Sequence, residues 1–293
     1  MQKILVLRGG ALGDFIVTLP ALGLLRHRWP QARIEFAGNA TAAAIGQTER
    51  VIDVVHSQHE ARWAALYGGE KLPAEFARWL TDFDLVLSYW PDPEGELARR
   101  FPLRNQQTFL SAAAVPTEAP AAAHYCAPLR ALGCATADYF FPLKNVDAPI
   151  RDRIAIHPGS GSPRKNWPRE RWTALCEWLH EKFSAELRIV VGEAEADAAS
   201  VFAKHGRVLV NLPLPKLASE LAGCSLFLGH DSGVSHLAAA CGLSCVLLFG
   251  PTDPAMWAPP SSRVSVLRRG PEMNSISLAD VQHAVTTQLA IRA

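Results

Sequence analysis

The sequence lacks a strong charge bias, closely paired cysteines and long apolar runs. Its net charge is only +1, whereas a dedicated nucleic-acid-binding protein carries a pronounced basic surface, so nucleic acid is not an expected partner. None of the six cysteines forms a CxxC pair, and most lie within apolar segments. We therefore expect buried, reduced thiols in a cytosolic protein, with zinc binding or disulfides as the less favoured alternatives.

Segments that would direct the chain to or across a membrane are also missing. No run approaches the roughly 20 apolar residues that span a bilayer. The apolar stretch from Ile4 to Leu7 is followed at once by Arg8 and is too short for a secretory signal peptide. These two absences predict a cytoplasmic protein.

Familiar cofactor and metal motifs are absent as well. Gly9 and Gly13 bracket a turn after an apolar run, but the G-x-G-x-x-G spacing of NAD-binding proteins is missing. The turn at 157–168 includes Lys165 without the Gly-Lys-Ser/Thr of a Walker motif. The acids of Asp82-x-Asp84 stand at the start of an expected strand, where a structural role is favoured over Mg²⁺ binding. The sequence therefore predicts neither a cofactor nor a metal site.

Strand-length apolar runs and helical patterns alternate along the 293 residues, which is long enough for two domains. Such alternation predicts an α/β protein with parallel sheets. Expected strands are 3–8, 32–37, 51–55, 83–88, 153–157, 187–191, 207–211, 225–229, 244–249 and 263–267. Expected helices lie near 14–28, 39–48, 73–81, 120–132, 168–183, 195–205, 215–222, 234–241 and 278–290.

The two halves of the chain begin in the same way. The run from Lys3 to Leu7 leads into Gly9, Gly10 and Gly13, and the run from Arg153 to Ile156 leads into Gly159 and Gly161. A proline-containing, charged stretch at 140–153 resembles a linker. We therefore expect two Rossmann-like domains, 1–147 and 148–293, with their sheets facing a central cleft.

The turn Asp231-Ser232-Gly233 carries the clearest functional signal. It separates an expected buried strand from a short apolar helix that contains His236. The unpaired N–H groups and the dipole of a helix N-terminus favour an anion, and Gly233 lets the backbone approach a ligand closely. A phosphate or diphosphate is the expected guest, although His236 could instead pack inside the helix.

Three other segments place polar groups where parallel strands end. Asp14 is either a helix cap or a carboxylate that faces the cleft as a general base. Ser160 and Lys165, in the turn after the second opening strand, suit phosphate oxygens, and the alternative is a solvated surface loop. Glu193 and Glu195 follow the expected strand 187–191, where an acid either binds ribose hydroxyls or simply begins a helix.

Taken together, four motifs resemble the heptosyltransferases of lipopolysaccharide core synthesis, glycosyltransferase family 9. They are Gly13-Asp14 with Thr18 to Leu22, His157-Pro158-Gly159 with Lys165 to Pro168, Asp231-Ser232-Gly233 with His236 to Ala239, and Phe249 to Pro254. The resemblance implies a GT-B fold with the donor on the C-terminal domain, the acceptor on the N-terminal domain, and a C-terminal helix near 278–290 that crosses back. Residues 57–125 show no match, so the acceptor stays open.

The resemblance also implies roles for individual residues. Asp14 corresponds to the catalytic base and Arg8 to a basic residue near the acceptor's carboxylate. The donor-binding residues would be Ser160, Lys165, Glu195, Asp231, Ser232, Gly233 and His236, with Glu193 as the alternative to Glu195 at the ribose.

The expected activity is therefore inverting, metal-independent transfer of a sugar to a hydroxyl group of a glycan. The donor would be ADP-heptose, and the acceptor a lipopolysaccharide-type or other glycan. A peripheral contact with the inner face of the inner membrane is left open. The alternatives are a family 9-like enzyme with another nucleotide-sugar donor, a sugar-nucleotide epimerase, and a non-catalytic nucleotide-sugar-binding protein.

Overall fold

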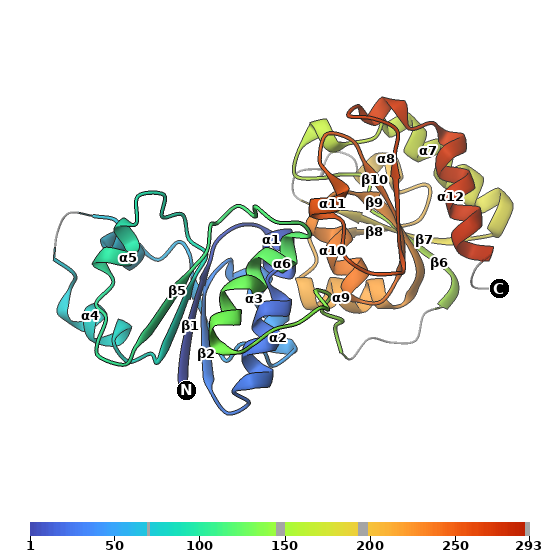
Figure 1. The fold of residues 1–293 in the computed structure, drawn as a ribbon. Coiled ribbons are helices and arrows are strands. Elements are labelled where there is room, and N and C mark those ends of the chain that lie inside the picture. The colour runs from blue at the N-terminus through green and yellow to red at the C-terminus, as the bar shows by residue number, and fades with distance from the viewer. Residues whose placement is uncertain (69–70, 145–149, 193–198, 291–293) are drawn as a thin grey trace. The chain divides into compact units, whose positions relative to one another are not determined.

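The computed structural model describes the chain apart from residues 69–70, 145–149, 193–198 and 291–293 (Figure 1). It divides into two compact units, Met1–Phe141 and Pro142–Ala293. The expected boundary between residues 147 and 148 falls inside the undescribed stretch 145–149, a few residues after the observed division. Each unit is built around one parallel sheet.

The sheet of the first unit has the strand order β3-β2-β1-β4-β5, and every neighbouring pair is parallel. The strands are β1 (Lys3–Arg8), β2 (Arg33–Gly38), β3 (Val54–Ser57), β4 (Leu85–Ser88) and β5 (Thr108–Ser111). The central strand β1 is almost continuously apolar because helices cover both faces of the sheet. Strand β5 was not predicted.

Helices α1 (Leu12–Ile16), α2 (Leu19–Arg28), α3 (Ala40–Thr48) and α6 (Ala121–Cys126) gather on one face of this sheet, and α4 (Ala74–Leu80) and α5 (Glu96–Arg100) on the other (Figure 1). The helix expected at 14–28 is in fact two, because Pro20 has no N–H for a continuing helix and suits the first turn of α2. The unit also contains the 3-10 helices η1 (Ala61–Leu66) and η2 (Ala127–Leu132).

The sheet of the second unit has the order β11-β10-β9-β6-β7-β8, again parallel throughout. Its strands are β6 (Ile150–Ile156), β7 (Glu186–Val191), β8 (Arg207–Val210), β9 (Cys224–His230), β10 (Ser244–Phe249) and β11 (Val264–Arg268). The helices are η3 (Pro163–Lys165), α7 (Arg169–Phe183), α8 (Ala199–Phe202), α9 (Leu214–Ala222), α10 (Gly233–Ala240), α11 (Pro254–Trp257), η5 (Met273–Ser275) and α12 (Leu278–Ala290).

Helices α7 and α12 pack on each other and close the core of the second unit. Trp172, Leu175 and Leu179 recur at helical spacing along α7, and all three side chains are buried. The buried residues of α12, Val281 and Val285, belong to the same core. The expected return of this helix to the first domain stays a prediction.

Strand order reverses beside β1 in the first sheet and beside β6 in the second. Ligands of open parallel sheets bind outside the carboxyl ends of the strands at such a switch point. In the first unit the loops there follow β1 and β4, and in the second unit they follow β6 and β9. The turns that carry Asp14, Lys165 and Asp231 are among them.

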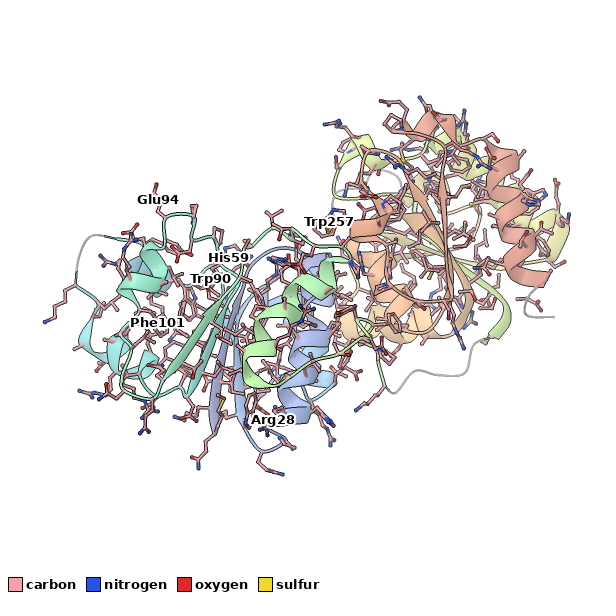
Figure 2. The ribbon with its side chains drawn as sticks, in the orientation of Figure 1. Arg28, His59, Trp90, Glu94, Phe101 and Trp257 are labelled. Carbon is pink, nitrogen blue, oxygen red and sulfur yellow. The ribbon has the colours of Figure 1, made fainter. Side chains whose placement is uncertain are left out.

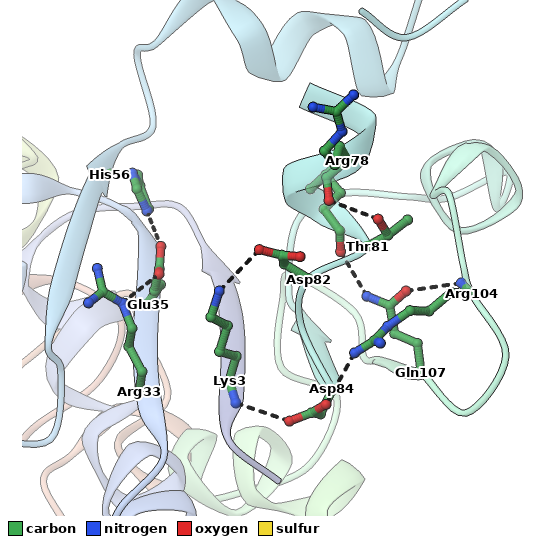
Figure 3. Close-up of polar contacts among 11 residues, drawn as sticks. Lys3, Arg33, Glu35, His56, Arg78, Thr81, Asp82, Asp84, Arg104 and Gln107 are labelled. Atoms are coloured by element: carbon green, nitrogen blue, oxygen red, sulfur yellow. Dashed lines mark hydrogen bonds and ion pairs between the residues drawn. The ribbon is translucent and has the colours of Figure 1, made fainter. Parts of the chain in front are cut away.

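The opposite, amino-terminal edge of the first sheet holds the Asp82-x-Asp84 pair (Figure 3). Asp82 pairs with Lys3 Nζ at 3.1 Å, and Asp84 pairs with Arg104 at 3.2 Å. Burial raises the pKa of Asp84, but backbone hydrogen bonds from Gln2 and Lys3 outweigh burial and hold the pKa below its usual value. The predicted structural role is confirmed.

All six cysteines are buried and none forms a disulfide, as predicted. Burial raises the pKa of Cys126, Cys176 and Cys224 to about 12, so these thiols stay protonated. Among the described helices, none has the length and apolar character needed to cross a bilayer. No three His, Cys, Asp or Glu side chains gather as a metal ion's ligands would within the described ranges.

Candidate active site

The turn after β9 opens helix α10 in the manner expected of an anion site. Ser232 is the N-cap residue, and its hydroxyl accepts a hydrogen bond from the Ser235 N–H at 3.3 Å. The His236 N–H is bound to the Ser232 carbonyl, also at 3.3 Å. In this first turn, which lies within the described part of the chain, the N–H groups left for an anion are therefore those of Gly233 and Val234.

His236 lies one turn into α10 and its side chain is buried. A contact with phosphate stays a prediction for this residue. Gly233 is a helical residue, since the positive-φ glycines among the described residues are Gly10, Gly95, Gly133, Gly242 and Gly270. Its lack of a side chain matters for close approach to a ligand rather than for an unusual backbone conformation.

An ion pair joins the two turns of the second unit. Lys165 Nζ lies 2.7 Å from Asp231 Oδ2, and the side chains are 30% and 9% exposed, respectively. The ion pair thus holds Lys165 at the carboxyl edge of the sheet. The alternative expectation was a lysine in a solvated surface loop. Asp231, the more buried partner, holds the lysine ammonium group in place.

His230 links the same two turns through hydrogen bonds of its imidazole ring. Its Nε2 accepts the Trp167 N–H at 2.9 Å, which leaves Nδ1 to donate to the Gly159 carbonyl at 3.1 Å. Burial lowers the pKa of His230 to about 3, so the imidazole is neutral. The predicted strand ended at Gly229, so His230 was missed. Its position as a polar residue directly before Asp231 was a signal that it could belong to the site.

Ser160 shapes the glycine-rich turn from within. Its hydroxyl oxygen lies 2.7 Å from Asn166 Oδ1 and 2.8 Å from the Ser162 carbonyl, and it accepts the Ser162 N–H at 3.3 Å. A contact between Ser160 and a donor stays a prediction. The candidate ribose-binding acids Glu193 and Glu195 lie outside the described residues.

In the first unit, Asp14 caps a helix, which is one of the two roles that the sequence left open, and its role as a general base stays a prediction. Its Oδ2 accepts the Ala11 N–H at 2.9 Å, as a helix-capping group does, and its Oδ1 accepts from Arg8 Nη2 at 2.8 Å. The side chain is still 34% exposed. Gly10, with a φ of +110°, makes this possible, because a Cβ there would stand 2.5 Å from Asp14 Oδ2.

Side chains of the residues that directly follow β2 and β3 fix the Gly10 turn. Gln58 Oε1 accepts the Gly10 N–H at 3.2 Å, and Asn39 Nδ2 donates to the Gly10 carbonyl at 3.2 Å. His59 and Trp90 lie at the same end of the sheet (Figure 2), and the Trp90 ring comes within 3.9 Å of the position that a Cβ on Gly9 would take. The sequence analysis did not single out these four residues, because residues 57–125 matched no motif and Asn39 lay outside the motifs that were recognised.

Arg8 is buried, with 5% of its side chain exposed. Its guanidinium donates to Asp14, to Tyr125 Oη at 2.8 Å, to the Ala114 carbonyl at 3.3 Å and to Thr18 Oγ1 at 3.4 Å. The expected contact of Arg8 with an acceptor stays a prediction. The hydrogen-bond partners that the structure shows for Arg8 are all atoms of the protein itself. Tyr125 was not singled out from the sequence.

Comparison with known proteins decides the family. Residues 106–284 match the family model described as glycosyltransferase family 9 (heptosyltransferase). The chain belongs to glycosyltransferase family 9. The resemblance inferred from the motifs is thereby confirmed, and the chain is a glycosyltransferase. The matched range includes Lys165 and the Asp231 turn, whereas Arg8 and Asp14 precede it.

Relatives and solved structures agree with this assignment. Lipopolysaccharide heptosyltransferase 1 of Pseudomonas aeruginosa is 26% identical over 289 residues, covering 86% of this chain and 80% of the relative. A family 9 glycosyltransferase from Veillonella parvula superposes with a TM-score of 0.79 at 20% identity, covering 99% and 97% of the two chains. The Escherichia coli heptosyltransferase WaaC with ADP gives 0.78 at 19% identity, covering 98% and 100%. The predicted GT-B fold with two Rossmann-like domains is confirmed.

Proposed function

We propose that this glycosyltransferase moves a heptose from ADP-heptose to a hydroxyl group of a lipopolysaccharide core acceptor. Relatives that align over most of the chain are named lipopolysaccharide heptosyltransferase 1. Structures of the same fold were solved with ADP and with ADP-2-deoxy-2-fluoro heptose. The observation that carries the proposal is the Lys165–Asp231 pair, which holds a cation beside the turn that opens α10.

On the donor side, the diphosphate of ADP-heptose would lie against the N–H groups of Gly233 and Val234. These groups and the dipole of α10 favour negative charge. Lys165 would donate to a phosphate oxygen, which gains charge as the bond to the sugar breaks. A cation and oriented amides stabilise such a leaving group without a metal, so we propose a metal-independent reaction with no cofactor.

On the acceptor side, Asp14 would accept the proton of the attacking hydroxyl group as that oxygen bonds to the anomeric carbon. The bond from this carbon to the diphosphate oxygen breaks, and its electron pair leaves with ADP. The transition state resembles the oxocarbenium ion of glycoside hydrolysis. A single displacement of this kind inverts the anomeric configuration.

Such an acceptor is attached to a lipid, so we also propose that the protein acts peripherally at the inner face of the inner membrane. The polar acceptor sugar, and not the lipid, would reach Asp14. This location extends the same proposal and is tested by binding to vesicles with and without the acceptor glycolipid.

The donor is tested by thermal shift with ADP-, GDP- and UDP-sugars, followed by a transfer assay with the preferred one. A ligand at 100 times its Kd stabilises the native state by about 2.7 kcal/mol, which raises Tm by about 5–10 °C for a unit of this size. We expect that rise with ADP-heptose alone. Stabilisation by a GDP- or UDP-sugar would indicate a different donor, and binding without transfer to any glycan would indicate a non-catalytic protein.

A further inference from the structure

The surroundings of Asp14 suggest that two other residues hold it in place. Arg8 Nη2 donates both to Asp14 Oδ1 and to Tyr125 Oη, each at 2.8 Å. The Arg8 guanidinium carbon also lies 4.5 Å from the centre of the Tyr125 ring, within the range of a cation–π contact. A buried cation is therefore clamped between the carboxylate and the phenol.

Tyr125 is itself rigidly placed. Its hydroxyl donates to the Ala114 carbonyl at 2.9 Å, and its backbone carbonyl accepts a hydrogen bond from the Tyr89 hydroxyl. Burial raises the pKa of Tyr125 even though Arg8 opposes this effect, so the phenol stays neutral and keeps its proton for Ala114. Its oxygen lone pairs then face the arginine.

We propose that Arg8 and Tyr125 are positioning residues that fix the Asp14 carboxylate for proton transfer, and we call Asp14, Arg8 and Tyr125 the buried brace. This proposal rests on the role of Asp14 in the proposed function. The brace would keep Oδ1 bound to the arginine while the exposed part of the carboxylate faces the acceptor.

The geometry favours positioning over substrate binding for Arg8. Four hydrogen bonds already run from its guanidinium to protein atoms, out of five N–H groups. The side chain is 5% exposed, whereas that of Asp14 is 34% exposed. An incoming acceptor would therefore meet the carboxylate first. A buried arginine also needs a counter-charge, and Asp14 supplies it.

The first experiment separates kcat from KM in Tyr125→Phe, which removes one hydroxyl group and keeps the ring. We expect kcat to fall about 10-fold, with unchanged KM for donor and acceptor, because small displacements of a reacting group reduce rates strongly. Tyr67→Phe is the control. It removes a hydroxyl that donates to a backbone carbonyl, that of Pro91, at 3.0 Å, and its kcat should stay within about twofold of wild type.

The second experiment uses chemical rescue. Arg8→Ala should lose about 10²-fold in kcat, and guanidinium should restore part of the loss by occupying the vacated site. A guanidinium concentration of about 20 mM is far below the molar concentrations that unfold proteins. Urea, which has the same shape without the charge, should not rescue. Equal rescue by urea, or an acceptor KM that rises while kcat is unchanged, would overturn the proposal.

The third experiment needs no substrate and so separates this proposal from the proposed function. In a double-mutant cycle of Tyr125→Phe and Asp14→Asn, the unfolding constants should show coupling by a factor of at least about 5. Additive effects would overturn the brace whether or not the enzyme transfers heptose. Coupling combined with an unchanged kcat in Tyr125→Phe would overturn the positioning role, and an inactive wild type would count against the proposed function alone.

Discussion

Replacing Lys165 by alanine should have two effects that the structure allows to be measured separately. The first is on stability, because Asp231 is left as a carboxylate that is only 9% exposed. Removing one partner of a fully buried ion pair costs about 3–5 kcal/mol. Because Lys165 itself is 30% exposed, solvent already screens the pair, and we expect a smaller loss of about 1–3 kcal/mol.

The second effect of Lys165→Ala is on binding of the nucleotide. A hydrogen bond from a charged donor contributes about 1.5–3 kcal/mol, so the Kd of ADP should rise about 10- to 150-fold. Adenosine carries no phosphate, and its affinity should not change. The unpaired charge of Asp231 would repel phosphate as well, which favours the upper part of this range.

The double variant Lys165→Ala/Asp231→Asn tells the two effects apart. It removes the unpaired charge, so the unfolding free energy should return toward the wild-type value while ADP affinity stays at least about 10-fold weaker. Arg164→Ala is the matched control, since Arg164 is an exposed cation in the same turn. Calorimetry with ADP and adenosine and urea unfolding provide the measurements. Wild-type ADP affinity in Lys165→Ala would refute the reasoning.

Asp14→Asn should keep ADP affinity but lose about 10²–10⁴-fold in turnover, the usual contribution of a general base; near-normal turnover would leave Asp14 as a helix cap. Transfer should persist in excess EDTA, and a chelator-inactivated reaction restored by Mg²⁺ or Mn²⁺ would contradict metal independence. Gly233→Val should weaken ADP binding without loss of fold, because a branched side chain would stand between the amides and the phosphate, as calorimetry and circular dichroism would reveal. Burial holds the pKa of His230 at about 3 instead of 6.5, so the unfolded chain gains a proton first as the pH falls. The contribution of neutral His230 to the free energy of unfolding is complete above pH 6.5. Below that pH the contribution should fall by about 1.4 kcal/mol per pH unit. His230→Asn should lack that component in urea unfolding at pH 7 and pH 5, and identical pH dependence in both proteins would argue against it.

The sequence predicts most of the fold because parallel strands buried on both faces are nearly continuous apolar runs. Strands β1 and β10 were predicted with their observed bounds. Strand β5 was missed because Thr108–Ser111 is a half-buried edge strand whose sequence shows no such run. The split of the first helix was missed because the break depends on the backbone requirements of Pro20.

The candidate site was predictable only as separate turns. A turn between a strand and a helix is a local pattern, so the Asp231 and Lys165 turns could be found from short stretches of sequence. The bond between them joins residues 66 positions apart, and the Arg8–Tyr125 bond joins residues 117 positions apart. No local pattern specifies such a pairing, because it depends on which strands become neighbours at the switch point of each sheet.

The same arrangement of charges recurs in the two units. In each, the residue with the proposed chemical role is paired with a more deeply buried residue of opposite charge: Lys165 with Asp231, and Asp14 with Arg8. The resemblance implied substrate contacts for all four residues, and these contacts stay predictions. The less buried member of each pair is accessible to a substrate, whereas the more buried member supplies its counter-charge. Asp231 therefore relates to Lys165 as Arg8 does to Asp14, and a substitution of either buried residue should act through its partner.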